Sequence, residues 1–189
     1  MSTNTATIAP TSVNGVDTDQ LHYVIDSIGA DADFAAFQFR ADNQWMNGGL
    51  NRSTIHGFFA GGKEDQSRTQ AFQLDADEPP IIAGQDTAPN PVEYILHALA
   101  GCLTTTMVYH ASVRGIDIEH CESHLEGDID LRGLLGMDED VRKGFNQVRV
   151  TMKVKSAADV ATLTECAMYS AVYEMISRAL PVEFSIEKV

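Results

Sequence analysis

Residues 89–106 constrain the fold of this chain more than any other segment, because they read as an apolar helix that opens on a proline. Pro91 suits the first turn of a helix, where its missing N–H would have had no partner. Glu93 in the same turn complements the positive end of the helix dipole. The pattern therefore predicts a helix over residues 91–113, closed by Gly115 as a C-terminal cap.

One cysteine lies on the apolar stripe of this predicted helix, and the stripe faces a core or a partner chain. The stripe has three- and four-residue spacing and contains Ile95, Leu99, Cys102, Thr106 and Met107. A cysteine in such a place is commonly a small hydrophobic core residue. It becomes a reactive nucleophile where a cation or hydrogen-bond donors stabilise its thiolate.

Composition excludes several classes of function. A net charge of −14 repels phosphate backbones, so we expect no nucleic-acid partner. No apolar run reaches the roughly 18 to 20 residues that cross a bilayer, and the N-terminal residues lack the regions of a signal peptide. We therefore expect no membrane partner and a cytoplasmic location.

The three cysteines, Cys102, Cys121 and Cys166, form neither an even-numbered framework nor a closely spaced pair. This spacing indicates reduced thiols or a regulated redox pair. His120 and His124 flank Cys121, but alternation along a strand puts the cysteine on the opposite face from both. We therefore expect no shared metal site at these residues. The sequence also has no nucleotide fingerprint, so we expect no cofactor.

The predicted elements follow the order strands, helix, strands, helix, strand, which is typical of an α+β fold. Alternating patterns predict antiparallel strands over 34–75, with a hairpin turn at Asn47-Gly48-Gly49, and two neighbouring strands over 116–131 and 146–155. A second long helix is expected over 157–180. An edge strand over 181–186 follows it, where a proline at the first position is tolerated.

We expect a single domain over residues 17–189. Its first part, residues 17–32, forms a short helical extension that follows Asp17 and Asp19. Residues 1–16 are rich in Ser, Thr, Asn and Ala, and this composition predicts a disordered segment.

Four segments together resemble the OsmC/Ohr family of thiol-dependent hydroperoxide reductases. They are PNPVEYILHALAGCLTTT, GDIDLRG, GFNQVRVTMKV and LTECAMYSAVYEMISRALPVEFSI, and the resemblance covers residues 40–189. It implies an OsmC-like fold in which antiparallel sheets enclose two long central helices. It also implies an intertwined homodimer.

The same resemblance implies a thiol peroxidase that reduces organic or fatty-acid hydroperoxides at a dimer-interface cleft. Cys102 would react as the thiolate, Arg52 would lower its pKa, and Glu93 would hold that arginine, with Arg40 as the alternative arginine. Nine residues separate Glu93 from Cys102, about 13 Å along a straight helix, so Glu93 can act on the thiol only through a side chain between them or across a subunit boundary. Compensation of the helix dipole explains a carboxylate at this position equally well. A small external dithiol would restore the oxidised enzyme.

The identity of the resolving thiol is left open by the sequence. The family has a second cysteine in its late helix, and a gap-free count places Ser170 there, one helical turn after Cys166. Either Cys166 resolves the oxidised Cys102 or no cysteine does, because a disulfide needs Cα atoms within about 7 Å. The displaced cysteine also favours an alternative function, a non-enzymatic small-molecule binding protein that keeps the fold.

Overall fold

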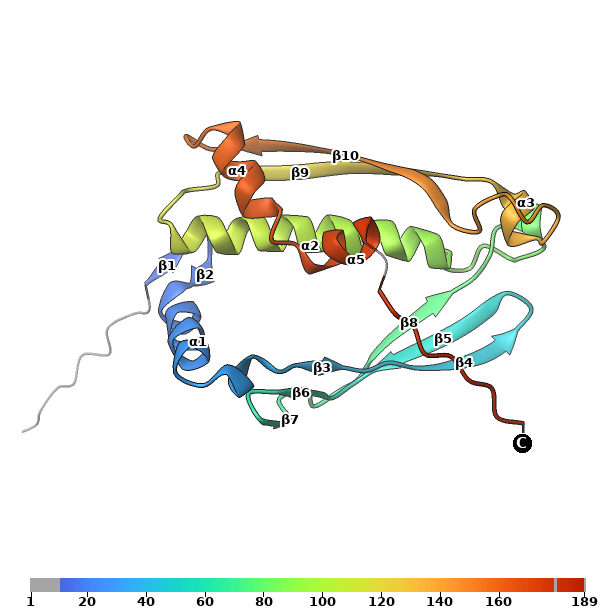
Figure 1. Cartoon of the computed structure of the whole chain (residues 1–189), viewed down its shortest axis with the longest axis horizontal. Helices are drawn as coiled ribbons and strands as arrows, with labels where there is room; N and C mark the ends of the chain where they lie inside the picture. Colours follow the sequence, from blue (N-terminus) through green and yellow to red (C-terminus); the bar gives the residue numbers. More distant parts are fainter. Residues whose placement is uncertain (1–10, 179, 189) are drawn as a thin grey trace, which may run out of the picture. The chain divides into compact units, whose positions relative to one another are not determined.

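The computed structural model describes residues 11–178 and 180–188 (Figure 1). The chain divides into two compact units, one up to residue 95 and one from residue 96 onward, and each is described by itself. Within the described part of the chain, no helix has the length and apolar character needed to cross a membrane.

The first unit begins with a small antiparallel hairpin followed by a helix and a 3-10 turn. These elements are β1 (Ser12–Val13), β2 (Val16–Asp17), α1 (Thr18–Ala30) and η1 (Ala32–Ala35). Asp17 caps α1 by accepting a hydrogen bond of 2.9 Å from the N–H of Gln20. Strand pairing orders residues 12–17, which differs from the disordered segment expected over 1–16. Residues 1–10 of that segment lie outside the described residues.

Six further strands of the first unit form two antiparallel sheets of three strands each. One sheet has the order β3 (Gln38–Phe39), β6 (Phe58–Ala60) and β7 (Lys63–Asp65). The other has the order β4 (Asp42–Asn47), β5 (Leu50–Ile55) and β8 (Phe72–Ala76). Gly48 adopts a φ of 57° in the turn between β4 and β5, a conformation that favours glycine. The predicted antiparallel strands and hairpin are therefore confirmed.

A loop containing η2 (Pro80–Ile82) leads from β8 to α2 (Pro91–Val113), and α2 has the bounds that the sequence predicts. Asn90 and Glu93 cap its start reciprocally: the Glu93 N–H donates to Asn90 Oδ1 at 2.9 Å, and the Asn90 N–H donates to Glu93 Oε2 at 2.8 Å. At the other end Gly115 has a φ of 69°, and the Gly115 N–H bonds to the Ser112 carbonyl at 3.0 Å. The predicted cap is confirmed.

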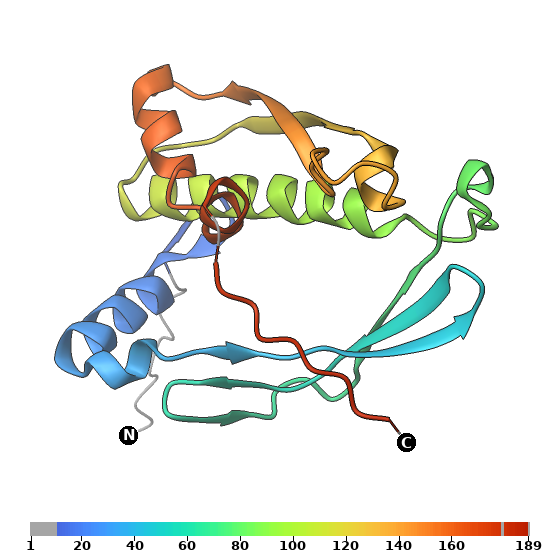
Figure 2. The same cartoon turned by 45° about the vertical axis from the view of Figure 1, so that its right-hand side comes forward.

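The second unit packs a two-stranded antiparallel ribbon along α2, as both views show (Figures 1 and 2). The ribbon consists of β9 (His120–Ile129) and β10 (Phe145–Lys155), joined through α3 (Leu131–Leu134). Partly buried side chains of the ribbon, such as Leu125, Val148 and Met152, pack against the core of the unit. The core is formed by Leu99, Leu103, Met107, Cys166 and Ala167.

Two shorter helices, α4 (Val160–Ala167) and α5 (Ala171–Ser177), replace the second long helix expected over 157–180. Apolar spacing continues through Met168 and Tyr169, but Ser170 has extended backbone angles and its side chain accepts the N–H of Tyr173, which starts a new helix. The expectation of a single second long helix is therefore wrong.

Residues 180–188 contain no strand, although the sequence predicts an edge strand over 181–186. An alternating pattern becomes a strand only where a neighbouring strand pairs with its backbone groups, and no described strand does so here. The edge-strand prediction is therefore wrong, while the mixed architecture of helices and antiparallel sheets confirms the α+β class.

Candidate functional site

Cys102 lies half-buried on α2 and meets the connection between α4 and α5. Two hydroxyl side chains and two backbone N–H groups lie near its sulfur and can stabilise the thiolate by hydrogen bonds: the hydroxyls of Ser170 and Thr106 and the N–H groups of Ala171 and Val172. The Sγ of Cys102 lies 3.8 Å from Oγ1 of Thr106, one turn further along the same helix. The sulfur is thus enclosed by donors from two separate segments of the second unit.

Opposing effects determine the pKa of the Cys102 thiol. Partial burial raises this pKa, because it disfavours the charged thiolate. The hydrogen bonds from Ser170, Val172, Thr106 and Ala171 lower it, and together they outweigh burial. The net pKa therefore lies below its ordinary value, which increases the fraction of thiolate, the nucleophilic form of cysteine.

Ser170 is buried and lies within hydrogen-bonding reach of Cys102. It is only 1% exposed, and its Oγ accepts the Tyr173 N–H at 3.2 Å. This bond uses a lone pair of the oxygen, so the single O–H proton remains available for Cys102. The predicted set of site residues lacks Ser170, although the gap-free count places it at the family's second-cysteine position.

Cys166 lies in the hydrophobic core of the second unit with no exposed surface. All three cysteines are free thiols in this structure. Arg114 lies close enough to interact electrostatically with Cys166, and its guanidinium pairs with Glu165 at 2.8 Å. A role of Cys166 in resolving oxidised Cys102 stays a prediction.

Arg52, in the first unit, stands directly opposite Asp75 in the register of β5 and β8. Its Nε lies 2.6 Å from Asp75 Oδ1 and its Nη2 lies 2.8 Å from Asp75 Oδ2. This bidentate pair raises the pKa of Arg52 and lowers that of Asp75. The sequence analysis does not include Asp75, because a sequence pattern identifies strands but does not give the register between them.

Glu93 is bonded to Asn90, and among the described residues no ion pair joins it to Arg52. The orienting role of Glu93 therefore stays a prediction. The next residue, Tyr94, donates its hydroxyl to the Asp75 carbonyl at 2.6 Å. Arg40, the alternative arginine, pairs instead with Glu64 at 2.5 Å on the other sheet.

Asp77 organises the loop that leads from β8 into α2. It is 2% exposed, and its carboxylate accepts hydrogen bonds from the N–H groups of Glu78, Gln85 and Thr87 and from the Thr87 hydroxyl. The backbone bonds from Thr87 and Glu78 hold the pKa of Asp77 below its ordinary range, although desolvation opposes them. The carboxylate therefore fixes the loop immediately before the capped start of α2.

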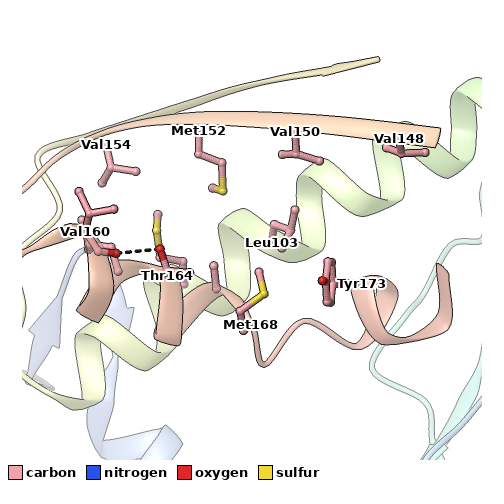
Figure 3. Close-up of a pocket in the computed structure, with 12 residues that line it drawn as sticks. Leu103, Val148, Val150, Met152, Val154, Val160, Thr164, Met168 and Tyr173 are labelled. Carbon is pink, nitrogen blue, oxygen red and sulfur yellow. Dashed lines mark hydrogen bonds between the residues drawn. The ribbon is translucent and has the colours of Figure 1, made fainter. Parts of the chain in front are cut away.

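An apolar cavity of about 560 Å³ lies in the second unit between β10, α2 and the α4–α5 segment (Figure 3). Four side chains of β10 line it in a row and face Leu103 of α2: Val148, Val150, Met152 and Val154. Its walls suit a hydrocarbon group. The described residues contain no group of three or more His, Cys, Asp or Glu side chains that could hold a metal ion.

A model of the OsmC-like protein family matches residues 84–187, which is more than half of the chain. A search of curated proteins finds no match. Among solved structures, the OsmC-like protein of Mycoplasma pneumoniae is similar with a TM-score of 0.53 and 13% identity, covering 75% of this chain and 89% of its own.

A second similar structure is a protein of Psychrobacter arcticus 273-4 with a proposed role in the osmotic stress and detoxification response. It has a TM-score of 0.52 and 15% identity, and the match covers 71% of this chain and 85% of that chain. At these identities the two likenesses show a shared fold and nothing further.

Proposed function

Because the chain belongs to the OsmC-like protein family, we propose that it is a thiol peroxidase that reduces organic or fatty-acid hydroperoxides with Cys102. The observation that carries the proposal is the set of donors around the Cys102 sulfur, which lowers the pKa of the thiol. Such stabilisation gives no advantage to a cysteine that only fills space in a core. It is what a nucleophilic thiolate requires.

The reaction begins when the Cys102 thiolate attacks the outer oxygen of the hydroperoxide. The O–O bond breaks, and the alkoxide takes up a proton and leaves as an alcohol. The sulfur is oxidised by two electrons and becomes a sulfenic acid. The groups at Ser170, Thr106, Ala171 and Val172 favour the thiolate from which this step begins.

The resemblance to the family adds two residues of the first unit to this proposal. Arg52 is the candidate cation that stabilises the thiolate, and Glu93 is the candidate that orients it. Asp75 now joins them, because its bidentate pair holds the Arg52 guanidinium in one orientation. An external dithiol would return the enzyme to its reduced form. The three free cysteines fit a reducing compartment, so we place the activity in the cytoplasm.

We propose that the protein acts as a homodimer. Large apolar side chains of the first unit are exposed, including Phe39 at 69%, Trp45 at 70% and Phe72 at 58%. The buried residues described in that unit are the polar Thr18 and Asp77, so its sheets lack an apolar core of their own. A second copy would cover these side chains.

Light scattering tests the dimer, with an expected mass of twice that of one chain. Trp45→Glu should shift the mass toward the monomer, because it places a charge in an apolar interface. Gln44→Glu, its exposed neighbour on β4, serves as the control and should remain dimeric. A monomeric wild type at micromolar concentration would contradict this part of the proposal.

The peroxidase is tested by following consumption of cumene hydroperoxide in the presence of a dithiol. Cys102→Ser should abolish consumption, because only the thiolate reacts and the change is nearly isosteric. Cys121→Ser removes another half-buried thiol and should retain the wild-type rate. A Cys102→Ser protein that works at the wild-type rate would overturn the mechanism.

The cavity beside β10 favours a second candidate, a non-enzymatic protein that binds small apolar molecules. A thiol titration before and after one equivalent of cumene hydroperoxide separates the two. Loss of thiol supports the peroxidase, whereas an unchanged thiol count supports the binding protein.

A further inference from the structure

We infer that oxidised Cys102 is resolved by a small external thiol that attacks its sulfenic acid directly, and by no other cysteine of the chain. The inference rests on the proposed function and specifies the partner of the same site. It is carried by two side chains of the second unit, Ser170 and Cys166.

The side chain that meets the Cys102 sulfur from the α4–α5 connection is a hydroxyl. Ser170 is 1% exposed and is fixed by the bond from the Tyr173 N–H to its Oγ. The hydroxyl donates to sulfur but forms no disulfide with it. The position from which a second thiol would resolve Cys102 is therefore occupied by a group that stabilises the sulfur without reacting.

Cys166 is not at that position, because α4 ends at Ala167 and the chain turns before Ser170. The two residues therefore do not share one continuous helical face. Cys166 is fully buried, and its neighbours in the core include Leu99, Leu103 and Met107. A disulfide with Cys102 would therefore require the Cys166 sulfur to give up its close packing in this core.

An external thiol meets no such obstacle, because Cys102 is only half-buried and a small molecule can approach it without displacing the core side chains around Cys166. The thiol sulfur attacks the sulfenic acid sulfur, the S–O bond breaks, and water leaves with the thiol proton. The product is a mixed disulfide between Cys102 and the small molecule. A second thiol, on another molecule or on the same dithiol, then attacks the small-molecule sulfur, releases the small-molecule disulfide and restores Cys102.

The test treats wild type, Cys166→Ser and the control Cys121→Ser with one equivalent of cumene hydroperoxide in the absence of thiols. Dimedone then traps sulfenic acid, and non-reducing peptide mapping locates any disulfide. We expect dimedone on Cys102 to the same extent in all three proteins. After addition of 2-mercaptoethanol in place of dimedone, we expect the same mixed disulfide on Cys102 in each.

A Ser170→Cys variant provides the positive control, because it puts a thiol where the structure has the hydroxyl. It should form a Cys102 disulfide with residue 170 and lose most of its dimedone labelling. Retention of full labelling in this variant would overturn the assigned contact.

Two further outcomes would overturn the inference: the first leaves the proposed function intact, and the second rejects the proposed function as well. A Cys102–Cys166 disulfide in wild type, or sulfenic acid that persists only in Cys166→Ser, rejects the external thiol and leaves the peroxidase intact. Cys102 that stays reduced in every folded variant rejects the proposed function, and the inference with it.

Discussion

Arg52 and Asp75 face each other on adjacent strands and join through two parallel hydrogen bonds of 2.6 and 2.8 Å. A carboxylate that accepts two parallel hydrogen bonds from a guanidinium holds the guanidinium in one orientation as well as attracting its charge. Tyr94, in the first turn of α2, donates to the carbonyl of the same Asp75. Asp75 is therefore bonded both to Arg52 and to Tyr94, a residue at the start of α2.

Replacing Arg52 by Ala should raise the pKa of the Cys102 thiol, because the cation proposed to stabilise the thiolate is removed. The measurement is the rate of Cys102 alkylation by iodoacetamide as a function of pH. Arg40→Ala is the matched control, since Arg40 also lies in the first unit in an ion pair with a carboxylate. A shift in the control and none in Arg52→Ala would transfer the role to Arg40.

The Arg52–Asp75 pair should stabilise the fold at neutral pH and lose this effect in acid. The pKa of Asp75 is lowered in the folded protein, first by its hydrogen bond to Arg52. A lowered pKa gives a contribution that is present above the unfolded value of about 3.9 and is lost as the pH falls through the folded value.

Asp75→Asn checks this dependence through melting temperatures. The wild type should melt higher at neutral pH, and the difference should shrink once the pH falls below about 4. Asp42→Asn changes an exposed aspartate of the same sheet for which no ion pair is described, and should show no such trend. A difference that is constant down to strong acid would show that the ion pair is not its source.

Gly84 should not tolerate a side chain, because the loop before α2 closes tightly around it. A Cβ added there would lie 1.7 Å from the carbonyl oxygen of Glu78, which is backbone and cannot rotate away. Gly84→Ala should lower the free energy of unfolding by roughly 1–3 kcal/mol, measured by urea denaturation. A Cβ at Gly144 meets nothing within 4 Å, so Gly144→Ala should stay within about 0.5 kcal/mol of wild type.

The fold was predictable where local signals mark the ends of an element. Pro91 and Gly115 bracket α2, and the structure reproduces its bounds. The division of the second helix was not predictable from apolar spacing, which continues through Met168. At the break, the Tyr173 N–H donates a hydrogen bond to Ser170 Oγ. A hydrophobic pattern contains no information about such a hydrogen bond.

In the candidate site too, the sequence predicted residues marked by their own segment and missed residues whose partners lie in other segments. Cys102 is conspicuous in the sequence because it is a thiol inside a strongly patterned helix. Asp75 and Ser170 are not, since each acquires its partner through tertiary structure: Asp75 through the register of β5 and β8, and Ser170 through the packing of the α4–α5 connection against α2. Sequence patterns give residue types and elements, whereas such pairings depend on packing.

Ser170→Ala should slow the alkylation of Cys102 at neutral pH by about fivefold, because a hydrogen bond of about 1 kcal/mol to the thiolate is lost. The alkylation curve should move to higher pH, and hydroperoxide consumption at neutral pH should fall with it. The substitution also removes the cap of α5, so circular dichroism and the melting temperature are measured in parallel.

Two variants separate the hydrogen bond from the cap and from a general effect of serine removal. Ser170→Thr keeps a hydroxyl that both caps α5 and donates to sulfur, and should restore most of the alkylation rate. Ser177→Ala removes an exposed hydroxyl at the far end of α5 and should leave the curve unchanged. If Ser170→Ala alkylates at the wild-type rate while it remains folded, the hydroxyl contributes nothing to the thiolate. Its stabilisation must then come from Thr106 and the N–H groups of Ala171 and Val172, the other donors at the sulfur.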